Sequence, residues 1–208
     1  MTTRSYRVRA IDKLGAVAAL WLAISAASDA VGVLWAIGDI YVWSNLDRLP
    51  MAVLEIWDRI ALIGFAQTAV YVVAVFLVAK WTYRASANAH ASGRRLETSP
   101  PWAVGWYFIP VANLWKPYQA LAEVVSVAGA SRSGLPMGLW WGLWLTTSIS
   151  GNISFRLGLR AEEAHEVILA SAFSLVSCAA GIGAALALRR IILAVTLAQT
   201  QRQQTQVF

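Results

Sequence analysis

Residues that could carry out chemistry are few in this 208-residue sequence, and they form no complete catalytic or metal-binding set. The run Glu162-Glu163-Ala164-His165-Glu166 supplies one Glu-x-x-His spacing, whereas a di-iron site in a helical bundle needs two such spacings and further carboxylates. The single cysteine, Cys178, excludes an intrachain disulfide and a cysteine-based zinc site. No nucleophile-base set, phosphate-binding glycine loop or zinc-protease motif is present. We therefore predict no enzymatic activity, no metal and no cofactor.

The other chemical candidates are polar residues inside apolar runs, namely Asp29, Gln67 and Asn152. A carboxylate or amide in hydrocarbon must be paired, solvated or neutralised. Two interpretations of Asp29 are open. It is either a proton or cation site, or a hydrogen-bonded contact between helices, for which the sequence offers Asn152, Ser148 or Thr147 as partners.

Four long apolar runs must position these residues. They cover residues 14–38, 60–79, 137–155 and 167–188. Each is close to the roughly 20 helical residues that cross about 30 Å of hydrocarbon. Hydrophobic residues make up 58% of the chain and charged residues 13%, well below the roughly 25% of a soluble domain. The sequence thus predicts an all-α polytopic membrane protein with four transmembrane helices, forming a single membrane domain over residues 1–208.

Basic residues indicate the orientation, because Lys and Arg accumulate on the cytoplasmic side of a membrane. With four spans and both termini inside, thirteen of the seventeen basic residues are cytoplasmic. The cytoplasmic set is Arg4, Arg7, Arg9, Lys13, Lys80, Arg84, Arg94, Arg95, Lys116, Arg132, Arg189, Arg190 and Arg202. Because these residues flank the apolar runs and do not gather on one soluble face, the net charge of +6 favours the lipid bilayer as partner and argues against nucleic acid.

The connector over residues 101–130 is the most distinctive stretch. Its apolar run is too short to cross a membrane, and Pro110 and Pro117 interrupt any continuous helix. We expect an interfacial or re-entrant helical segment between the second and third spans, at the inner leaflet. An amphipathic helix should start at Pro117 and end between Gly129 and Gly134.

The C-terminal extension, residues 189–208, continues the fourth helix with apolar residues after Arg190. They are Ile191, Ile192, Val195 and Leu197. Because these side chains need a cover, the inner leaflet, the segment from Trp102 to Gly129 and a partner chain are the three options.

Two strings in the connector resemble the signature of a known family. They are Gly105-Trp106-Tyr107-Phe108-Ile109-Pro110 and Asn113-Leu114-Trp115-Lys116-Pro117-Tyr118-Gln119, and they resemble domain of unknown function 4328 over about residues 60–195. The resemblance implies a multi-pass protein of the bacterial cytoplasmic (inner) membrane and carries no activity. In that family an acidic residue follows the motif, and Glu123 occupies this place. Candidate interface residues are Trp106, Pro110, Asn113, Trp115, Lys116, Pro117, Tyr118 and Gln119.

We therefore expect a non-catalytic membrane module, a scaffold or accessory subunit that docks a membrane-protein partner or forms a homo-oligomer. The alternative is a small transporter or channel in which Asp29, Gln67 and Asn152 line one water-accessible path. A lipid-modifying enzyme is the third hypothesis, and the lack of a nucleophile-base pair argues against it. The tryptophans near the membrane boundaries are explained either by interfacial anchoring or by an aromatic pocket for a specific lipid or pigment tail.

Overall fold

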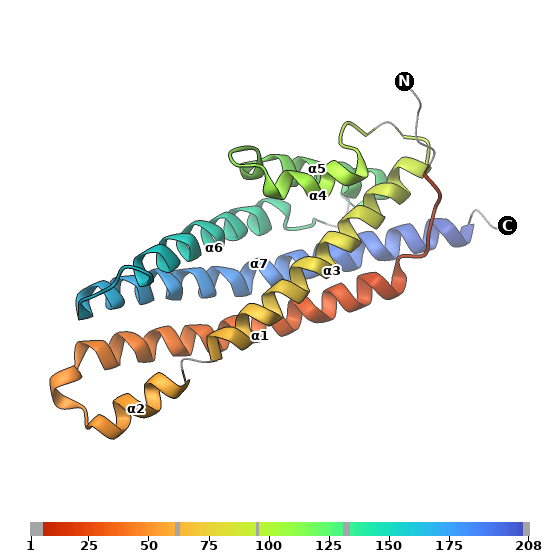
Figure 1. Ribbon diagram of the computed structural model, residues 1–208. Helices are drawn as coiled ribbons and strands as arrows, with labels where there is room; N and C mark the ends of the chain where they lie inside the picture. Colours follow the sequence, from red (N-terminus) through yellow and green to blue (C-terminus); the bar gives the residue numbers. More distant parts are fainter. Residues whose placement is uncertain (1–5, 61–62, 95, 131–133, 206–208) are drawn as a thin grey trace. The chain divides into compact units, whose positions relative to one another are not determined.

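The computed structural model describes residues 6–60, 63–94, 96–130 and 134–205, and this part of the chain contains helices and no strand (Figure 1). The α-helices are α1 (Asp12–Ser44), α2 (Met51–Ile60), α3 (Ile63–Ala91), α4 (Pro100–Gly105), α5 (Lys116–Ala128), α6 (Met137–Gly158) and α7 (Ala164–Thr205). Short 3-10 turns are η1 (Leu46–Arg48), η2 (Trp106–Phe108) and η3 (Ala112–Leu114). The all-α prediction is confirmed. Residues 61–62 and 206–208, together with Arg4, Arg95 and Arg132, entered the predictions above but lie outside the described residues.

Three helices of the described chain, not the predicted four, are long and apolar enough to cross a membrane. They are α1, α3 and α7, with 33, 29 and 42 residues. At about 1.5 Å per residue their lengths are roughly 50, 44 and 63 Å, more than the ~30 Å of a hydrocarbon core. The predicted third span, residues 137–155, does form a helix, the 22-residue α6, but its tryptophans and hydroxyl residues make it less apolar. These three helices are consistent with a membrane protein.

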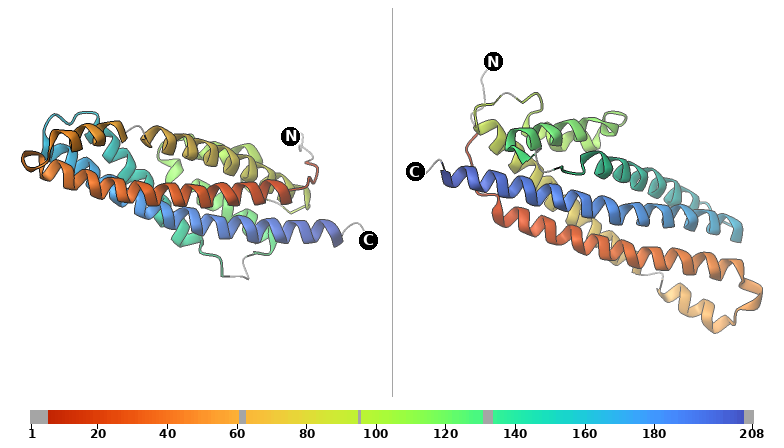
Figure 2. Two further views of the ribbon diagram at one scale, coloured as in Figure 1. Left: turned by 90° about the horizontal axis from the view of Figure 1, so that it is seen from below. Right: turned by 180° about the vertical axis from the view of Figure 1, so that it is seen from behind.

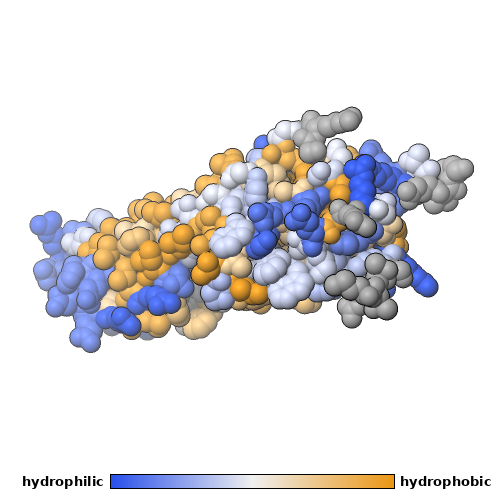
Figure 3. All heavy atoms as spheres, turned by 90° about the horizontal axis from the view of Figure 1, so that it is seen from above, coloured by the Kyte–Doolittle hydropathy of each residue, from blue (hydrophilic) through white to orange (hydrophobic). Residues whose placement is uncertain are grey.

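Contacts divide the chain into two compact units, to which α1, α3 and α7 all contribute. Unit 1 consists of Met1–Leu22, Val73–Gly138 and Ala187–Phe208, and unit 2 of Ala23–Val72 and Leu139–Leu186. On the face seen in Figure 3, apolar side chains form a broad band over unit 2, and hydrophilic side chains gather at the end of that unit where the helices turn. Such a band is what lipid-facing helices require.

Unit 2 contains a helix that the sequence analysis did not predict, the ten-residue α2. Its Trp57 ring stacks on Trp35 of α1 with 4.3 Å between ring centroids, and the Trp57 Nε1–H donates to Asp39 Oδ1 at 3.0 Å. The Ser171 hydroxyl donates to the other oxygen of Asp39. Asp39 therefore joins α1, α2 and α7 of this unit at one carboxylate.

Unit 1 buries the apolar residues of α7 that follow Arg190. Ile191, Ile192 and Val195 are all 0% exposed, whereas Leu197 is 60% exposed. In this unit the end of α7 lies beside the start of α1 (Figure 2), and hydrogen bonds connect it to α3 and α5. The predicted need for a cover is thus met for these three residues by the chain itself.

Trp81 of α3 is the largest buried side chain of unit 1, with 0% exposure. Its indole Nε1–H donates to the Thr196 hydroxyl of α7 at 3.0 Å. Gly15 of α1 lies directly against Thr196, because a Cβ atom at Gly15 would come within 2.3 Å of the threonine Oγ1. The absence of a side chain at Gly15 is what allows α1 and α7 to approach so closely in this unit.

Candidate functional site

The connector folds into α4, η2, η3 and α5, and its prolines explain why these pieces are short. Pro100 and Pro101 begin α4, and Pro117 is the second residue of α5, at helix positions where the missing N–H is not needed. Between them the chain turns at Pro110, and the next residue, Val111, has a φ of 66°, which is rare for a β-branched residue. The predicted amphipathic helix is confirmed as α5, which ends at Ala128 with Gly129 at a φ of 70°.

A groove of about 970 Å³ lies between α4, η2, α5 and the segment that precedes α4. Its lining is Leu96, Glu97, Thr98, Ser99, Trp102, Trp106, Lys116, Tyr118, Gln119, Ala122, Glu123, Ser126 and Val127. Aromatic rings, both signs of charge and several hydroxyl groups share this surface. Such a lining resembles the anchor-rich core and polar rim of a protein interface more than the apolar wall that a lipid tail needs.

Aromatic and cationic groups meet on one side of the groove. The Trp102 and Trp106 rings lie 4.6 Å apart between centroids at an interplanar angle of 31°. The Lys116 Nζ lies 5.8 Å from the centroid of Trp106, within the range of a cation–π interaction. These two contacts fix the Trp106 ring between a second indole and a charge, so that its orientation in the groove is set before any ligand arrives.

Glu123 holds the opposite side of the groove. Its carboxylate accepts the Thr98 backbone N–H at 3.1 Å and the Thr98 hydroxyl at 3.3 Å. Because a charged acceptor strengthens both bonds, this contact fastens the segment before α4 onto α5. Glu123, the acidic residue that follows the motif in the family resemblance, therefore helps to shape the groove.

Four of the eight predicted interface residues line the groove, namely Trp106, Lys116, Tyr118 and Gln119. The others do not line it. Pro117 is buried at the start of α5, Asn113 is half-buried in η3, and Pro110 and Trp115 are exposed. Their prediction as interface residues is neither confirmed nor contradicted by this placement.

Apolar side chains are exposed in the turn between α4 and α5. Phe108 is 75% exposed and Val111 66%, and Leu114 is also exposed. Tyr107 behaves differently, because burial raises the pKa of its hydroxyl well above the ordinary value, so that it stays protonated. The turn thus presents aliphatic and aromatic surface outside the groove, as a segment in contact with a leaflet does.

The polar residues predicted inside the spans lie in unit 2. Gln67 Nε2 donates to the Ser28 carbonyl at 2.8 Å, and Asn152 Oδ1 accepts from Arg156 Nε at 2.8 Å. Asp29 is half-buried against Gly181, where a Cβ atom would come within 2.4 Å of its Oδ2.

Two of the three partners predicted for Asp29 bond elsewhere, since Thr147 and Ser177 each donate their hydroxyl to the other's carbonyl and Asn152 pairs with Arg156. None of the hollows described here is lined by Asp29, Gln67 or Asn152. Close packing of α1 on α7 at Gly181 therefore takes the place of the predicted polar contact.

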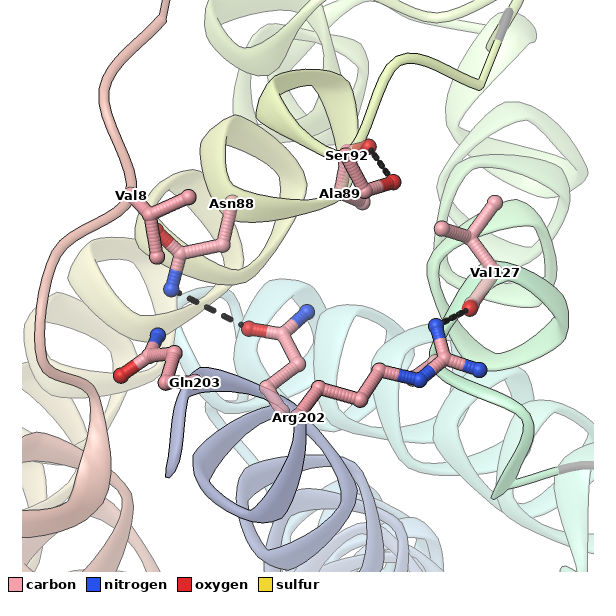
Figure 4. Close-up of a pocket in the computed structure, with 9 residues that line it drawn as sticks. Val8, Asn88, Ala89, Ser92, Val127, Arg202 and Gln203 are labelled. Atoms are coloured by element: carbon pink, nitrogen blue, oxygen red, sulfur yellow. Dashed lines mark hydrogen bonds between the residues drawn. The ribbon is translucent and has the colours of Figure 1, made fainter. Parts of the chain in front are cut away.

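Sequence reasoning missed the role of Asn88 in a small cavity of about 50 Å³ at the end of α3 (Figure 4). The Asn88 amide accepts the Arg9 N–H and donates to the Arg9 carbonyl, both at 2.9 Å, and also donates to Gln199 Oε1 at 3.2 Å. It thereby holds the extended N-terminal segment against unit 1. The position of an amide near the end of an apolar helix was the only sequence signal, and it did not reveal the distant partner.

Within the described ranges, no three His, Cys, Asp or Glu side chains gather in a way that could hold a metal ion. The groove is accordingly described by its aromatic, cationic and carboxylate groups alone.

Comparison with known proteins adds a family but no activity. No curated protein and no solved structure matches the chain. A family model does match over residues 45–197, which extends further towards the N-terminus than the resemblance of the motif suggested. The chain therefore belongs to the family described as Domain of unknown function (DUF4328).

Proposed function

We propose that this protein is a non-catalytic membrane module that docks a segment of a partner membrane protein in the groove between α4 and α5. The observation that carries the proposal is that half of the predicted interface residues line an open groove, beside two packed tryptophans. Trp and Tyr side chains around a concave surface are typical anchors for a polypeptide. The lining includes both Lys116 and Glu123, which suits a chain with polar groups better than a lipid tail.

The end of α7 is not a candidate docking surface, because three of its apolar residues are covered. Since Ile191, Ile192 and Val195 are buried by the chain itself, they do not call for a partner. The groove and the exposed turn at Phe108 are then the surfaces of the connector that stay open. We assign the turn to the inner leaflet and the groove to the partner.

A photo-crosslinking experiment in the native membrane tests this assignment. With p-benzoylphenylalanine in place of Trp102, we expect one adduct of defined mass that contains a second membrane protein. The additional substitution Lys116→Glu should reduce its yield about tenfold, the equivalent of ~1.4 kcal/mol of binding. The matched control carries the same photoreactive residue at Tyr83, which is exposed in unit 1 but outside the groove. An adduct containing only a second copy of the chain, or equal yields at both positions, would contradict docking of a different protein.

We further propose α6 as a fourth crossing, with both termini on the cytoplasmic side of a bacterial inner membrane. Four of the five hydroxyls that make α6 less apolar have acceptors. Thr146 and Ser150 donate to carbonyls one turn earlier, whereas Thr147 and Ser154 donate to carbonyls of Ser177 and Ala170 in α7. Because hydroxyls satisfied in this way lose little on leaving water, a 22-residue helix of about 33 Å is compatible with the bilayer.

Labelling with a membrane-impermeant maleimide in intact cells distinguishes four crossings from three. In a Cys178→Ala background, Arg160→Cys lies between α6 and α7, and we expect it to be labelled from outside. If α6 does not cross, this loop faces the cytoplasm and is labelled only after permeabilisation. Asp47→Cys before α2 and Ser92→Cys after α3 serve as the outside and inside controls, because their sides are the same in both topologies.

The transporter alternative lacks a comparable observation. No hydrogen bond is described for the Asp29 carboxylate, and a cation site could use such a carboxylate. However, Gln67 is bonded to Ser28, and Asn152 is bonded to Arg156 on the exposed side of α6. These bonds therefore do not support a shared transport path lined by the three residues.

A further inference from the structure

A second hollow of unit 1, of about 540 Å³, lies where the ends of α5 and α7 meet the segment that follows α3. Its lining is Arg94, Ser126, Ala128, Gly129, Ala198, Gln201, Arg202 and Thr205. Two guanidinium groups, two hydroxyls and one amide therefore face one space. None of these eight residues is acidic.

The surrounding helices do not neutralise the two arginines. Beyond Glu166, the sequence of α7 contains no Asp or Glu. Glu123 is the only acid of α5, and its carboxylate is bonded to Thr98 on the groove side. Glu97, on the segment after α3, lines the groove and not this hollow. The positive charge of Arg94 and Arg202 is thus not matched by an acid among the residues that line the hollow.

The Arg202 guanidinium is already positioned. It donates to the Val127 carbonyl in the last turn of α5, as a cation at a helix C-terminus does (Figure 4). A Cβ atom at Gly129 would come within 2.9 Å of its Nη2, so the glycine also leaves room for the planar group. Arginine carries five N–H donors, and the bond to Val127 uses one of them. The others are free to form the paired bonds that guanidinium makes with phosphate oxygens.

We propose that this hollow binds the phosphoryl group of a phosphate-bearing ligand through Arg94 and Arg202, with Ser126, Gln201 and Thr205 as neutral neighbours. Ser126 also lines the groove, so the two sites share one residue of α5. A planar guanidinium recognises phosphate in two-point contacts, and the hydroxyl and amide groups can donate to the remaining oxygens.

The position of the hollow along α7 favours a soluble ligand over a lipid headgroup. Arg190 marks the predicted inner boundary, and Arg202 follows twelve residues later, which is about 18 Å along a helix. The headgroup layer adds only about 5–8 Å on each side of the hydrocarbon core. A solute in the aqueous phase therefore reaches Arg202 more readily than a headgroup of the same membrane does.

Calorimetric titration of the full-length protein in neutral detergent with inorganic pyrophosphate tests the site. We expect saturable binding that weakens about tenfold in Arg94→Gln and again in Arg202→Gln, since each removes one charge-assisted contact. Arg48→Gln removes the same charge from the loop before α2 in unit 2 and should bind like the wild type. Arg94→Gln leaves every hydrogen bond named here intact, so its folding is not in question.

A parallel arm measures binding to vesicles of a neutral lipid into which anionic phosphatidylglycerol is mixed. Loss of pyrophosphate binding in both variants supports a phosphoryl site that takes a solute. Loss in the vesicle arm alone supports the same phosphoryl site with a lipid as its source. If both variants bind pyrophosphate and vesicles as tightly as Arg48→Gln does, the proposal is overturned. None of these three outcomes depends on a partner docked in the groove.

Discussion

A chain that ends at Arg190 should fail to accumulate in the membrane as a folded protein. The truncation removes Ile191, Ile192 and Val195, which are fully buried in unit 1. Loss of each such aliphatic side chain typically costs about 2–5 kcal/mol, so the three together approach the ~5–15 kcal/mol by which a whole protein is stable. The hydrogen-bond acceptor of Trp81, the Thr196 hydroxyl, is lost as well. The measurement is the amount of protein in the membrane fraction and its elution profile in mild detergent.

A chain that ends at Gln201 is the matched control. It keeps the three buried residues, Thr196 and Gln199, and loses the bond from Arg202 to the Val127 carbonyl. We expect near-normal accumulation and a lower temperature of unfolding. If the chain that ends at Arg190 elutes like the full-length protein, the end of α7 is not part of the core of unit 1. The inner leaflet or a partner chain would then have to cover its apolar residues.

The apolar helices were predictable because their signal is local. Uninterrupted runs of apolar residues predicted α1, α3 and α7 without any knowledge of neighbours. The same holds for α5, whose first turn contains Pro117 and whose end is set by Gly129. The predicted continuation of the fourth helix past Arg190 is confirmed, because a helix does not end at a membrane surface when its next apolar face is buried by the protein. Other helix boundaries were less well predicted, since α3 ends at Ala91 and the predicted span at residue 79.

The third predicted span shows the limit of hydropathy alone. α6 has the length to cross, but Trp140, Trp141 and Trp144 and its hydroxyls reduce its apolar character. Whether such residues oppose burial in lipid depends on their partners, and acceptors such as the Ser177 and Ala170 carbonyls of α7 are visible only in the folded chain. α2 was missed because its ten-residue pattern is too short to predict a helix. The contact of Trp57 with Asp39, which holds it in place, is visible only in the folded chain.

The candidate site was predictable as a segment but not as a groove. The motif identified a segment that contributes to the groove, because prolines and tryptophans in an interrupted apolar stretch are visible in the sequence. The groove itself depends on contacts between distant residues, above all the bond of Thr98 to Glu123, which are 25 positions apart. The hollow between Arg94 and Arg202 depends on more distant chain segments still. No periodicity links such positions, so only the folded chain shows them together.

Gly15→Ala should destabilise unit 1 by about 1–5 kcal/mol. The added methyl group would lie 2.3 Å from Thr196 Oγ1 and 3.0 Å from Thr196 Cβ, and a β-branched side chain cannot rotate away freely. Overpacking of this kind costs about 1–3 kcal/mol. Displacement of the hydroxyl also leaves the buried Trp81 indole N–H without its acceptor, which adds about 1–3 kcal/mol. The better helix propensity of alanine offsets at most about 1 kcal/mol. The measurement is the unfolding temperature of the protein in detergent.

Gly142→Ala makes the same chemical change on the exposed side of α6, where a Cβ atom meets nothing within 4 Å. It should leave the unfolding temperature unchanged or raise it slightly, because only helix propensity changes. In the Gly15→Ala chain, Thr196→Ala should restore part of the lost stability by making room for the methyl group, although the Trp81 N–H stays unpaired. Equal unfolding temperatures for the Gly15 and Gly142 variants would show that α1 and α7 are not in close contact at Thr196. The burial of Trp81 would then need another explanation.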